Sequence, residues 1–248
     1  MTRVLVVTGG SRGIGAACAR LGAKAGWSVC LSYRSDARSA RLVVDDIERD
    51  GGRALAVAAD VCSERDTIAL FDRAQATFGP VSGLINNAGV LAPASRLSAM
   101  ALDRWNATIA TNLTGTFLCA REAVRRMAKS AGGAGGAIVN VSSKAAVLGA
   151  PGEFVDYAAS KGGVDALTIG LAKEVASDGI RVNGVRPGLI DTEIHASGGD
   201  AGRAARLAPT VPMQRTGTAD EVARAILWLL SDEASYCTGI TIDISGGR

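Results

Sequence analysis

The chain has 248 residues, of which 48% are hydrophobic and 21% are charged, and its net charge is +3. This length is enough for one large core, and the scarcity of aromatic residues (4%) beside 31 glycines argues against an all-β sandwich. Basic and acidic residues mix along the whole sequence, which argues against nucleic-acid binding, and no apolar run is long enough to span a bilayer.

Short β-branched runs alternate with helix-length segments throughout the sequence. We expect strands at 4–8, 28–33, 53–60, 81–86, 136–142, 180–185 and 239–244, and helices at 14–26, 36–50, 63–77, 103–130, 157–177 and 219–231. Near-continuous apolar strands are typical of a parallel sheet that is covered on both faces. The alternation therefore predicts an α/β fold, a single-domain Rossmann-type doubly wound parallel sheet of about seven strands over 1–248, with ligands at the carboxyl ends of the strands.

A glycine-rich turn, TGGSRGIG, follows the first strand and leads into a helix. Gly9, Gly13 and Gly15 would allow a tight turn and a close approach of backbone N–H groups to a pyrophosphate at the helix N-terminus. Because strand and helix stand in the right order around it, the turn favours dinucleotide binding.

The end of the second strand indicates which dinucleotide is preferred. NAD-binding folds usually carry Asp or Glu there, but this sequence reads Ser32, Tyr33, Arg34, Ser35, with no acid before Asp36. The guanidinium groups of Arg12 and Arg34 could converge on a 2′-phosphate. We therefore predict a preference for NADP (NADPH), with NAD possible and two solvent-exposed arginines as the alternative interpretation.

The later part of the chain contains a Tyr-x-x-x-Lys pair and a long insertion. Tyr157 and Lys161, in DYAASK, would share one face of a helix, which in isolation is typical of an ordinary surface helix. Residues 189–215 hold several glycines after a strand, and we expect a substrate flap near 190–213. Together with Glu153, the flap residues Asp191, Glu193 and His195 could favour a polyhydroxylated substrate, although solvent exposure would explain the same polarity.

Several motifs in register resemble the short-chain dehydrogenase/reductase family over nearly the whole chain. These are TGGSRGIG, Asp60-Val61, the stretch Asn86-Asn87-Ala88-Gly89, Asn112 in TNLTG, Ser143, Tyr157 with Lys161, Pro187-Gly188 and Thr192. The segment from Ser143 to Tyr157 is one residue longer than usual in the family. Alternation in NVSS favours Ser143 over Ser142 as the residue matching the catalytic serine. The sequence looks most similar to a sugar-dehydrogenase-like or uncharacterised bacterial oxidoreductase branch.

The resemblance implies NAD(P)-dependent hydride transfer between a carbonyl and a secondary alcohol. The implied catalytic residues are Asn112, Ser143, Tyr157 and Lys161. The implied cofactor-binding residues are Gly9, Ser11, Arg12, Gly13, Ile14, Gly15, Tyr33, Arg34, Asp60, Val61, Asn87, Ala88, Gly89, Tyr157, Lys161, Pro187, Gly188, Ile190 and Thr192. Lys161 and the oxidised nicotinamide would lower the pKa of the Tyr157 phenol from about 10 toward neutrality.

Other interpretations remain open or are disfavoured. An NAD-dependent sugar or polyol dehydrogenase and a 3-oxoacyl reductase are the alternatives, with a non-catalytic dinucleotide sensor as a distant one. A single histidine and the absence of G-x-S-x-G argue against a metal site and against a Ser–His–Asp hydrolase. An enoyl reductase would typically have a longer Tyr–Lys spacing.

The resemblance also implies a homotetramer (or homodimer) that forms through helices 103–130 and 157–177 and the stretch 226–247. The partner is expected to be a small-molecule carbonyl or alcohol rather than a nucleic acid or a membrane. The five cysteines are widely spaced and the start of the chain has no signal-peptide pattern, which favours a reducing, cytoplasmic location.

Overall fold

A parallel sheet forms the centre of the molecule. The computed structural model describes residues 3–248, with the side chain of His195 outside the described part. The sheet has seven strands in the order β3-β2-β1-β4-β5-β6-β7, which confirms the predicted doubly wound α/β fold. The strands are β1 (Arg3–Val7), β2 (Trp27–Tyr33), β3 (Arg53–Ala58), β4 (Val81–Asn86), β5 (Gly136–Val141), β6 (Ile180–Pro187) and β7 (Thr241–Ile244).

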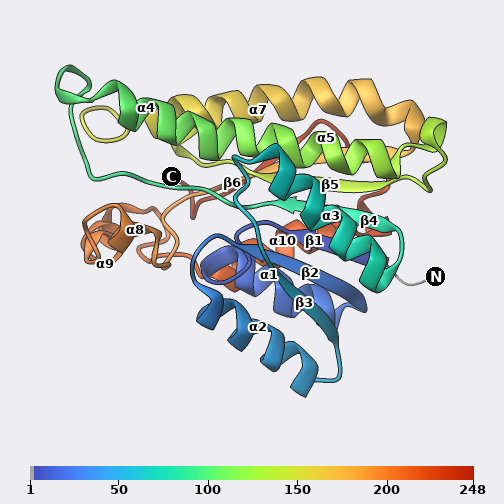
Figure 1. Ribbon diagram of the computed structural model, residues 1–248. Helices are drawn as coiled ribbons and strands as arrows, with labels where there is room; N and C mark the ends of the chain where they lie inside the picture. Colours follow the sequence, from blue (N-terminus) through green and yellow to red (C-terminus); the bar gives the residue numbers. More distant parts are fainter. Residues whose placement is uncertain (1–2) are drawn as a thin grey trace.

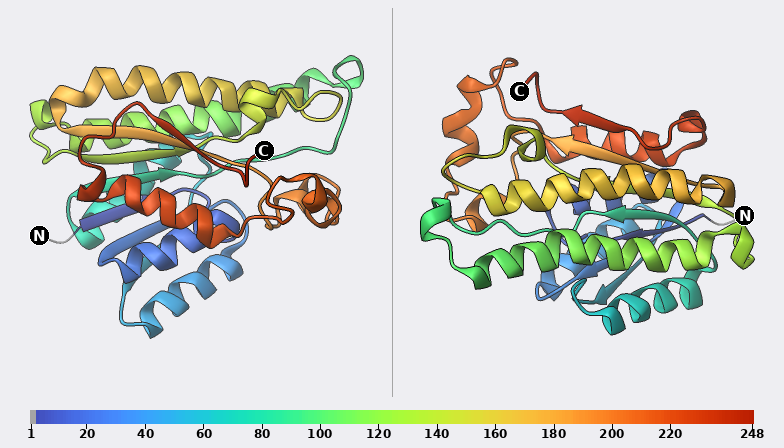
Figure 2. Two further views of the ribbon diagram at one scale, coloured as in Figure 1. Left: turned by 180° about the vertical axis from the view of Figure 1, so that it is seen from behind. Right: turned by 90° about the horizontal axis from the view of Figure 1, so that it is seen from above.

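Helices cover both faces of this sheet (Figures 1 and 2). One layer contains α3 (Glu64–Phe78), α4 (Leu102–Ile109), α5 (Gly115–Met127) and α7 (Val155–Val175), and the other contains α1 (Gly13–Lys24), α2 (Ala37–Arg49) and α10 (Ala219–Leu230). The apolar run of β1 serves both layers because side chains alternate along a strand. Leu5 and Val7 pack in the core toward α1, α2 and α10, whereas Val4 and Val6 pack in the core toward α3, α5 and α7.

The predicted helix over 103–130 is wrong as a single helix. It is divided into α4 and α5 by a π-helical turn, η2 (Ala110–Thr114), which carries the buried Asn112. The side chain of Asn112 bonds to Val90 and to Ser160, and the wider turn supplies the register that these bonds need.

Smaller differences concern the ends of elements and short turns. The last strand is shorter than the predicted 239–244, the predicted helix 157–177 begins and ends two residues earlier, and α6 (Ala145–Leu148) was not predicted. The flap region holds α8 (Ile194–Ser197), α9 (Arg203–Leu207) and η5 (Ala208–Thr210). The remaining short turns are η1 (Leu97–Ala99), η3 (Lys129–Ala131), η4 (Ala176–Asp178) and η6 (Asp232–Ala234).

The carboxyl ends of the strands meet at one edge, beside α8, α9 and the C-terminal end of the chain (Figure 1). The first described residues lie at the opposite edge. In the part of the chain that the structure describes, no helix is both long and apolar enough to cross a membrane. The carboxyl edge is therefore the place to look for a ligand site.

Candidate active site

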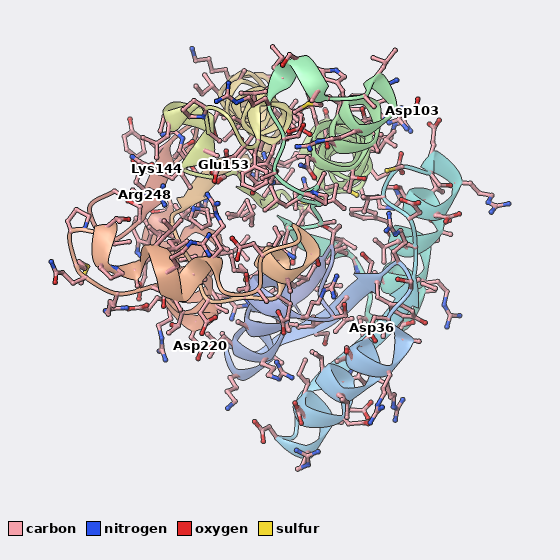
Figure 3. All side chains as sticks on the ribbon, turned by 90° about the vertical axis from the view of Figure 1, so that its left-hand side faces the viewer. Asp36, Asp103, Lys144, Glu153, Asp220 and Arg248 are labelled. Carbon is pink, nitrogen blue, oxygen red and sulfur yellow. The ribbon has the colours of Figure 1, made fainter. Side chains whose placement is uncertain are left out.

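A cavity of about 620 Å³ opens at the carboxyl edge of the sheet, a size suited to a small-molecule site. Figure 3 looks onto this edge, with Glu153 and Arg248 on one side of it and Asp36, at the start of α2, on the other. Every residue predicted to bind cofactor lines the cavity except Gly15, and Ser143 lines it as well. Gly15 and Asn112 lie behind the wall, where they contact residues that form it.

The glycine-rich turn between β1 and α1 is built for close approach. Gly13 has φ +53°, a left-handed conformation that glycine adopts without strain. A Cβ atom on Gly15 would lie 2.3 Å from the Gly9 carbonyl oxygen, so no larger residue fits there. Arg12 is extended just before α1 and places no side chain on the first N–H groups of the helix. These N–H groups suit a pyrophosphate.

The segment after β4 fixes this turn in place. The Thr8 hydroxyl accepts hydrogen bonds from the backbone N–H groups of Asn87 and Ala88, both at 3.0 Å. The Asn87 side-chain amide donates to the carbonyl oxygens of Thr8 and Gly9, at 2.9 and 3.0 Å. The Asn86 amide donates to Asn140 on the neighbouring strand β5 at 2.9 Å. The Asn-Asn-Ala-Gly stretch thus joins three central strands at the cavity floor.

The cavity wall beyond β2 carries arginine and tyrosine side chains. Arg12 and Arg34 are exposed on this wall and Tyr33 is partly buried. The Asp36 carboxylate accepts a hydrogen bond from the Ser39 backbone N–H at 3.0 Å and caps α2, and this bond lowers the pKa of Asp36. After the neighbouring strand β3, the side chain of Asp60 also lines the cavity and accepts a bond from the Cys62 N–H at 2.9 Å. Asp36 is therefore committed to its own helix.

The start of α7 and the end of β5 bring Tyr157 and Ser143 together. Burial raises the pKa of the Tyr157 phenol above its usual value, and a hydrogen bond with the Ser143 side chain lowers it by a smaller amount. The expected lowering of this pKa is therefore absent in the protein alone. The Ser142 hydroxyl is buried and donates to the backbone oxygen of Lys161 at 3.1 Å, so it is already occupied within the protein.

Lys161 is buried one helical turn after Tyr157. Its Nζ donates to the Val141 carbonyl oxygen at 2.7 Å and lies 5.7 Å from the centre of the Tyr157 ring. Burial lowers the pKa of Lys161 to about 8, against a smaller opposite effect of Asp165. A Cβ atom on Gly89 would lie 3.3 Å from Asn112 Oδ1 and 3.6 Å from Lys161 Nζ. The small residue at 89 thus keeps open the space between these two groups.

Asn112 is held more tightly than a residue that only binds water. Its Oδ1 accepts from the Val90 N–H at 2.8 Å, and its Nδ2 donates to the Val90 carbonyl and to the Ser160 hydroxyl, both at 3.1 Å. These bonds connect the π-helical turn to α7 and to the loop after β4. The side chain therefore holds the two walls of the cavity together.

The turn after β6 closes the cavity opposite the glycine-rich turn. The Gly188 N–H donates to the Ile244 carbonyl at 2.9 Å, and a Cβ atom on Gly13 would lie 3.4 Å from Thr192 Cγ2. Ile190 forms an isolated parallel bridge with Gly217. Thr192 thus lies beside the start of α1, and Pro187, Gly188 and Ile190 line the same cavity.

The flap contacts the segment before α7 through a guanidinium group. Arg203 of α9 donates to both carboxylate oxygens of Glu153, at 2.8 and 2.6 Å, and lies 5.0 Å from the centre of the Phe154 ring. These contacts lower the pKa of Glu153. Sequence reasoning did not find Arg203 or Arg248 at the cavity, because neither lies in a motif. Of the polar flap residues, Glu193 lines the cavity, Asp191 does not, and the His195 side chain is outside the described part.

The site gathers groups suited to proton transfer beside a surface suited to a dinucleotide. Within the described residues, no three His, Cys, Asp or Glu side chains lie close enough to hold a metal ion. The phenol, the ammonium and the serine hydroxyl converge from α7 and the end of β5. Their proximity allows a proton to be given to, or taken from, a substrate oxygen.

Comparison with known proteins agrees with this geometry. The family model described as enoyl-(acyl carrier protein) reductase matches residues 9–248. The chain is 52% identical to the uncharacterized oxidoreductase YgfF of Escherichia coli strain K12, over 99% of both proteins. It is 43% identical to 3beta-hydroxysteroid dehydrogenase 1 of Eggerthella lenta, over 99% of this chain and 93% of that protein.

A solved structure of a Serratia marcescens short-chain dehydrogenase/reductase, carrying two substitutions, superposes with a TM-score of 0.90 at 32% identity. The match covers 99% of this chain and 97% of that one. The relatives and the fold agree with the resemblance drawn from the motifs. The chain therefore belongs to the short-chain dehydrogenase/reductase family and is an NAD(P)-dependent oxidoreductase acting on CH–OH and C=O groups.

Proposed function

We propose that this chain is an NADP(H)-preferring oxidoreductase that interconverts a carbonyl and a secondary alcohol through Ser143, Tyr157, Lys161 and Asn112, as one domain over 1–248 with a flap near 190–213. The observation that carries the proposal is the convergence of Tyr157, hydrogen-bonded to Ser143, with the buried ammonium of Lys161. The four-residue Tyr–Lys spacing favours carbonyl chemistry over the enoyl reduction for which the matching family model is named.

The bound cofactor would supply or accept the hydride. Tyr157 would give its proton to the substrate oxygen during reduction and take one back during oxidation. Ser143 would donate to the same oxygen and stabilise the charge that develops on it. Lys161 would stabilise the phenolate by its charge, and Asn112 would hold Val90 and Ser160 in place around the pair.

The preference for NADP is supported by the wall beyond β2. Arg12 and Arg34 line the cavity and are exposed, which leaves their guanidinium groups available to a 2′-phosphate. The first carboxylate after β2 in the chain, Asp36, accepts a hydrogen bond from the Ser39 N–H. A charge-assisted hydrogen bond is worth about 1.5–3 kcal/mol, so Arg34→Ala should raise the KM for NADPH by roughly tenfold or more. The KM for NADH should change little, and an unchanged ratio of the two would contradict the preference.

Apolar residues in the lining of the cavity favour a substrate with an apolar body. Leu91, Leu148, Phe154 and Ile194 line the cavity, and the Glu153 carboxylate is already paired with Arg203. One relative is named as a dehydrogenase of a hydroxysteroid, an apolar ring with a secondary alcohol. A panel of cyclic ketones, sugars and 3-oxoacyl thioesters, tested with both cofactors, would distinguish this class from the sugar and 3-oxoacyl alternatives.

A homotetramer or homodimer in the cytoplasm completes the proposal. Exposed apolar side chains lie on α5 and α7 (Phe117 and Ile169) and near the last helix and strand (Trp228 and Ile240). All five cysteines of the chain are free, which is consistent with a reducing compartment. Light scattering that finds a stable monomer would contradict the assembly.

Tyr157→Phe tests the function directly. Removing the phenol should reduce turnover by at least about a hundredfold while NADPH binding, followed by its fluorescence, stays within a few-fold. Tyr236→Phe is the matched control, because that tyrosine is fully exposed. Substantial turnover by Tyr157→Phe would refute the mechanism. No turnover by the wild type on any carbonyl, with tight NADPH binding, would favour a non-catalytic sensor.

A further inference from the structure

Three ionisable side chains follow one another along the face of α7 that is turned toward the sheet. Tyr157, Lys161 and Asp165 are spaced four residues apart, and Lys161 and Asp165 are only 4% and 9% exposed. The first two belong to the Tyr-x-x-x-Lys motif, and the third belongs to none of the motifs in the sequence. A carboxylate that is withdrawn from water needs a partner.

That partner is Arg186 on β6. Its Nε donates to Asp165 Oδ2 at 2.8 Å, and the side chains of the pair are 22% and 12% exposed. The other oxygen, Oδ1, is buried and has no hydrogen-bond partner among the described residues. One oxygen of this carboxylate therefore has no donor of its own in the described part of the chain.

The pair continues into a network that reaches the catalytic serine and the turn after β6. Arg186 also contacts Asp243 on β7 at 3.4 Å, and the other oxygen of Asp243 accepts from Lys144. Lys144 follows Ser143 in the chain, and its backbone N–H donates to the Pro187 carbonyl at 2.9 Å. The network thus links α7, the turn after β6 and the segment that carries Ser143 (Lys144 is labelled in Figure 3).

Among the charged groups around Lys161, Asp165 is the one that stabilises its ammonium form. Among the other described charged groups on elements packed against α7, Asp103 of α4 is exposed, Arg181 of β6 donates to backbone carbonyls, and Asp178 of η4 accepts from the Ser130 N–H. Arg104 of α4 is bound to Asp156, and Glu122 of α5 is bound to Arg125 and Arg126. Lys144 and Asp243 belong to the network itself, and Arg186 opposes Asp165 with its own charge.

We propose that Asp165 and Arg186 are positioning residues that together set the charge on Lys161, the carboxylate holding the proton on the lysine and the guanidinium limiting that effect. The inference rests on the proposed acid–base role of Tyr157 and Lys161. Carbonyl reduction uses the fully protonated Tyr–Lys pair. When kcat for reduction is plotted against pH, its fall on the alkaline side (the alkaline limb) therefore reports how firmly that pair holds its first proton.

The test compares variants that neutralise each partner. Asp165→Asn removes a negative charge, so the alkaline limb of kcat for reduction should move to lower pH by about one pH unit. Arg186→Gln leaves the carboxylate uncompensated, so the limb should move to higher pH by a similar amount. Asp165→Glu should return it toward the wild-type position. A merely structural role would lower activity in both variants without moving the limb in opposite directions.

Two further measurements keep the test independent of turnover. The tyrosinate absorbance of Tyr157, taken as the difference between each protein and its Tyr157→Phe form, should shift in the same two directions without substrate. The matched controls are Asp46→Asn and Arg20→Gln, because this more exposed Asp–Arg pair, at 2.9 Å, lies on α1 and α2 and not at the cavity. They should move neither profile.

The outcomes separate this inference from the proposed function. If Tyr157→Phe remains active, the proposed function itself fails. If Tyr157→Phe is inactive, and both Asp165→Asn and Arg186→Gln keep the wild-type limb and absorbance titration, the inference is overturned while the function stands. Shifts of the same sign in both variants would also overturn it.

Discussion

Replacing Arg104 by Met would leave a buried carboxylate without its counter-ion directly beside the catalytic tyrosine. Arg104 donates to both oxygens of Asp156, at 2.9 and 3.2 Å, and also to the carbonyl oxygens of Pro93 and Glu153. Asp156 is 1% exposed, and among the described residues its one other side-chain donor is Thr108 at 3.2 Å. The two carbonyls can be rehydrated near the surface, whereas the carboxylate cannot.

The magnitude follows from that burial. Removing one partner of a buried ion pair costs about 3–5 kcal/mol, because the remaining charge is uncompensated. The matched control is Arg41→Met, whose pair with Asp45 lies on the surface with side chains 68% and 37% exposed, so the loss there should be at most about 0.5 kcal/mol. Urea unfolding at a fixed protein concentration measures both. The double variant Arg104→Met/Asp156→Leu should be more stable than Arg104→Met alone.

The stability loss of Arg104→Met should also change with pH in a definite direction. In the wild type, burial raises the pKa of Asp156, but Arg104, the Tyr157 N–H and Thr108 outweigh it, so the pKa lies below its usual value. The carboxylate therefore stabilises the fold above about pH 4, and this contribution is lost only as the pH falls further. Without Arg104 the effect of burial dominates and the pKa rises. The loss in free energy of unfolding of Arg104→Met, relative to the wild type, should then become smaller as the pH falls from 7 to 5. A loss below about 1 kcal/mol at pH 7, or one that does not change with pH, would refute the reasoning.

The remaining predictions concern the cofactor turn, the last helix and the flap. Gly15→Ala places a Cβ atom 2.3 Å from a backbone oxygen of the same turn, so NADPH affinity should fall at least about tenfold with little change in the substrate profile. Thr218→Ala removes the capping box at the start of α10 and should cost about 1 kcal/mol in urea unfolding. Glu153→Gln removes the charge that holds Arg203, so limited proteolysis should cut residues 198–210 faster while the unfolding midpoint changes little.

The fold could be predicted because its signals are local. The run at 4–8 predicted a strand buried on both faces, and Val4 and Leu5 indeed pack into opposite cores. The motif residues lie around one cavity because parallel strands end at one edge, so their order along the sequence was enough to bring them together. The π-helical turn around Asn112 left no such signal, since one wide turn scarcely disturbs the apolar periodicity of a long helix.

The supporting contacts could not be predicted because each joins residues far apart in the sequence. Arg186 meets Asp165 across 21 positions, and Arg203 meets Glu153 across 50. Arginine and carboxylate side chains are common on any surface, so composition does not identify these pairs. What identifies them is burial, which exists only once α7 lies on β6 and α9 lies over the segment before α7.

Burial also decides which member of the catalytic pair loses its proton first. The sequence suggested that the phenol gives way, but burial raises the pKa of Tyr157 and lowers that of Lys161 to about 8. In the protein alone the pair then keeps both protons below about pH 8, and one of them is available to the oxygen of a carbonyl substrate. We expect the rate of reduction to be level up to about pH 8 and to fall above it, as the coupled Tyr157–Lys161 pair loses its first proton. The rate of alcohol oxidation should rise with the same titration, because the pair must lose that proton before it can accept one from the alcohol. Stopped-flow measurements in both directions would check this, and an oxidation rate that is already level at pH 6 would mean that the phenol, not the lysine, titrates first.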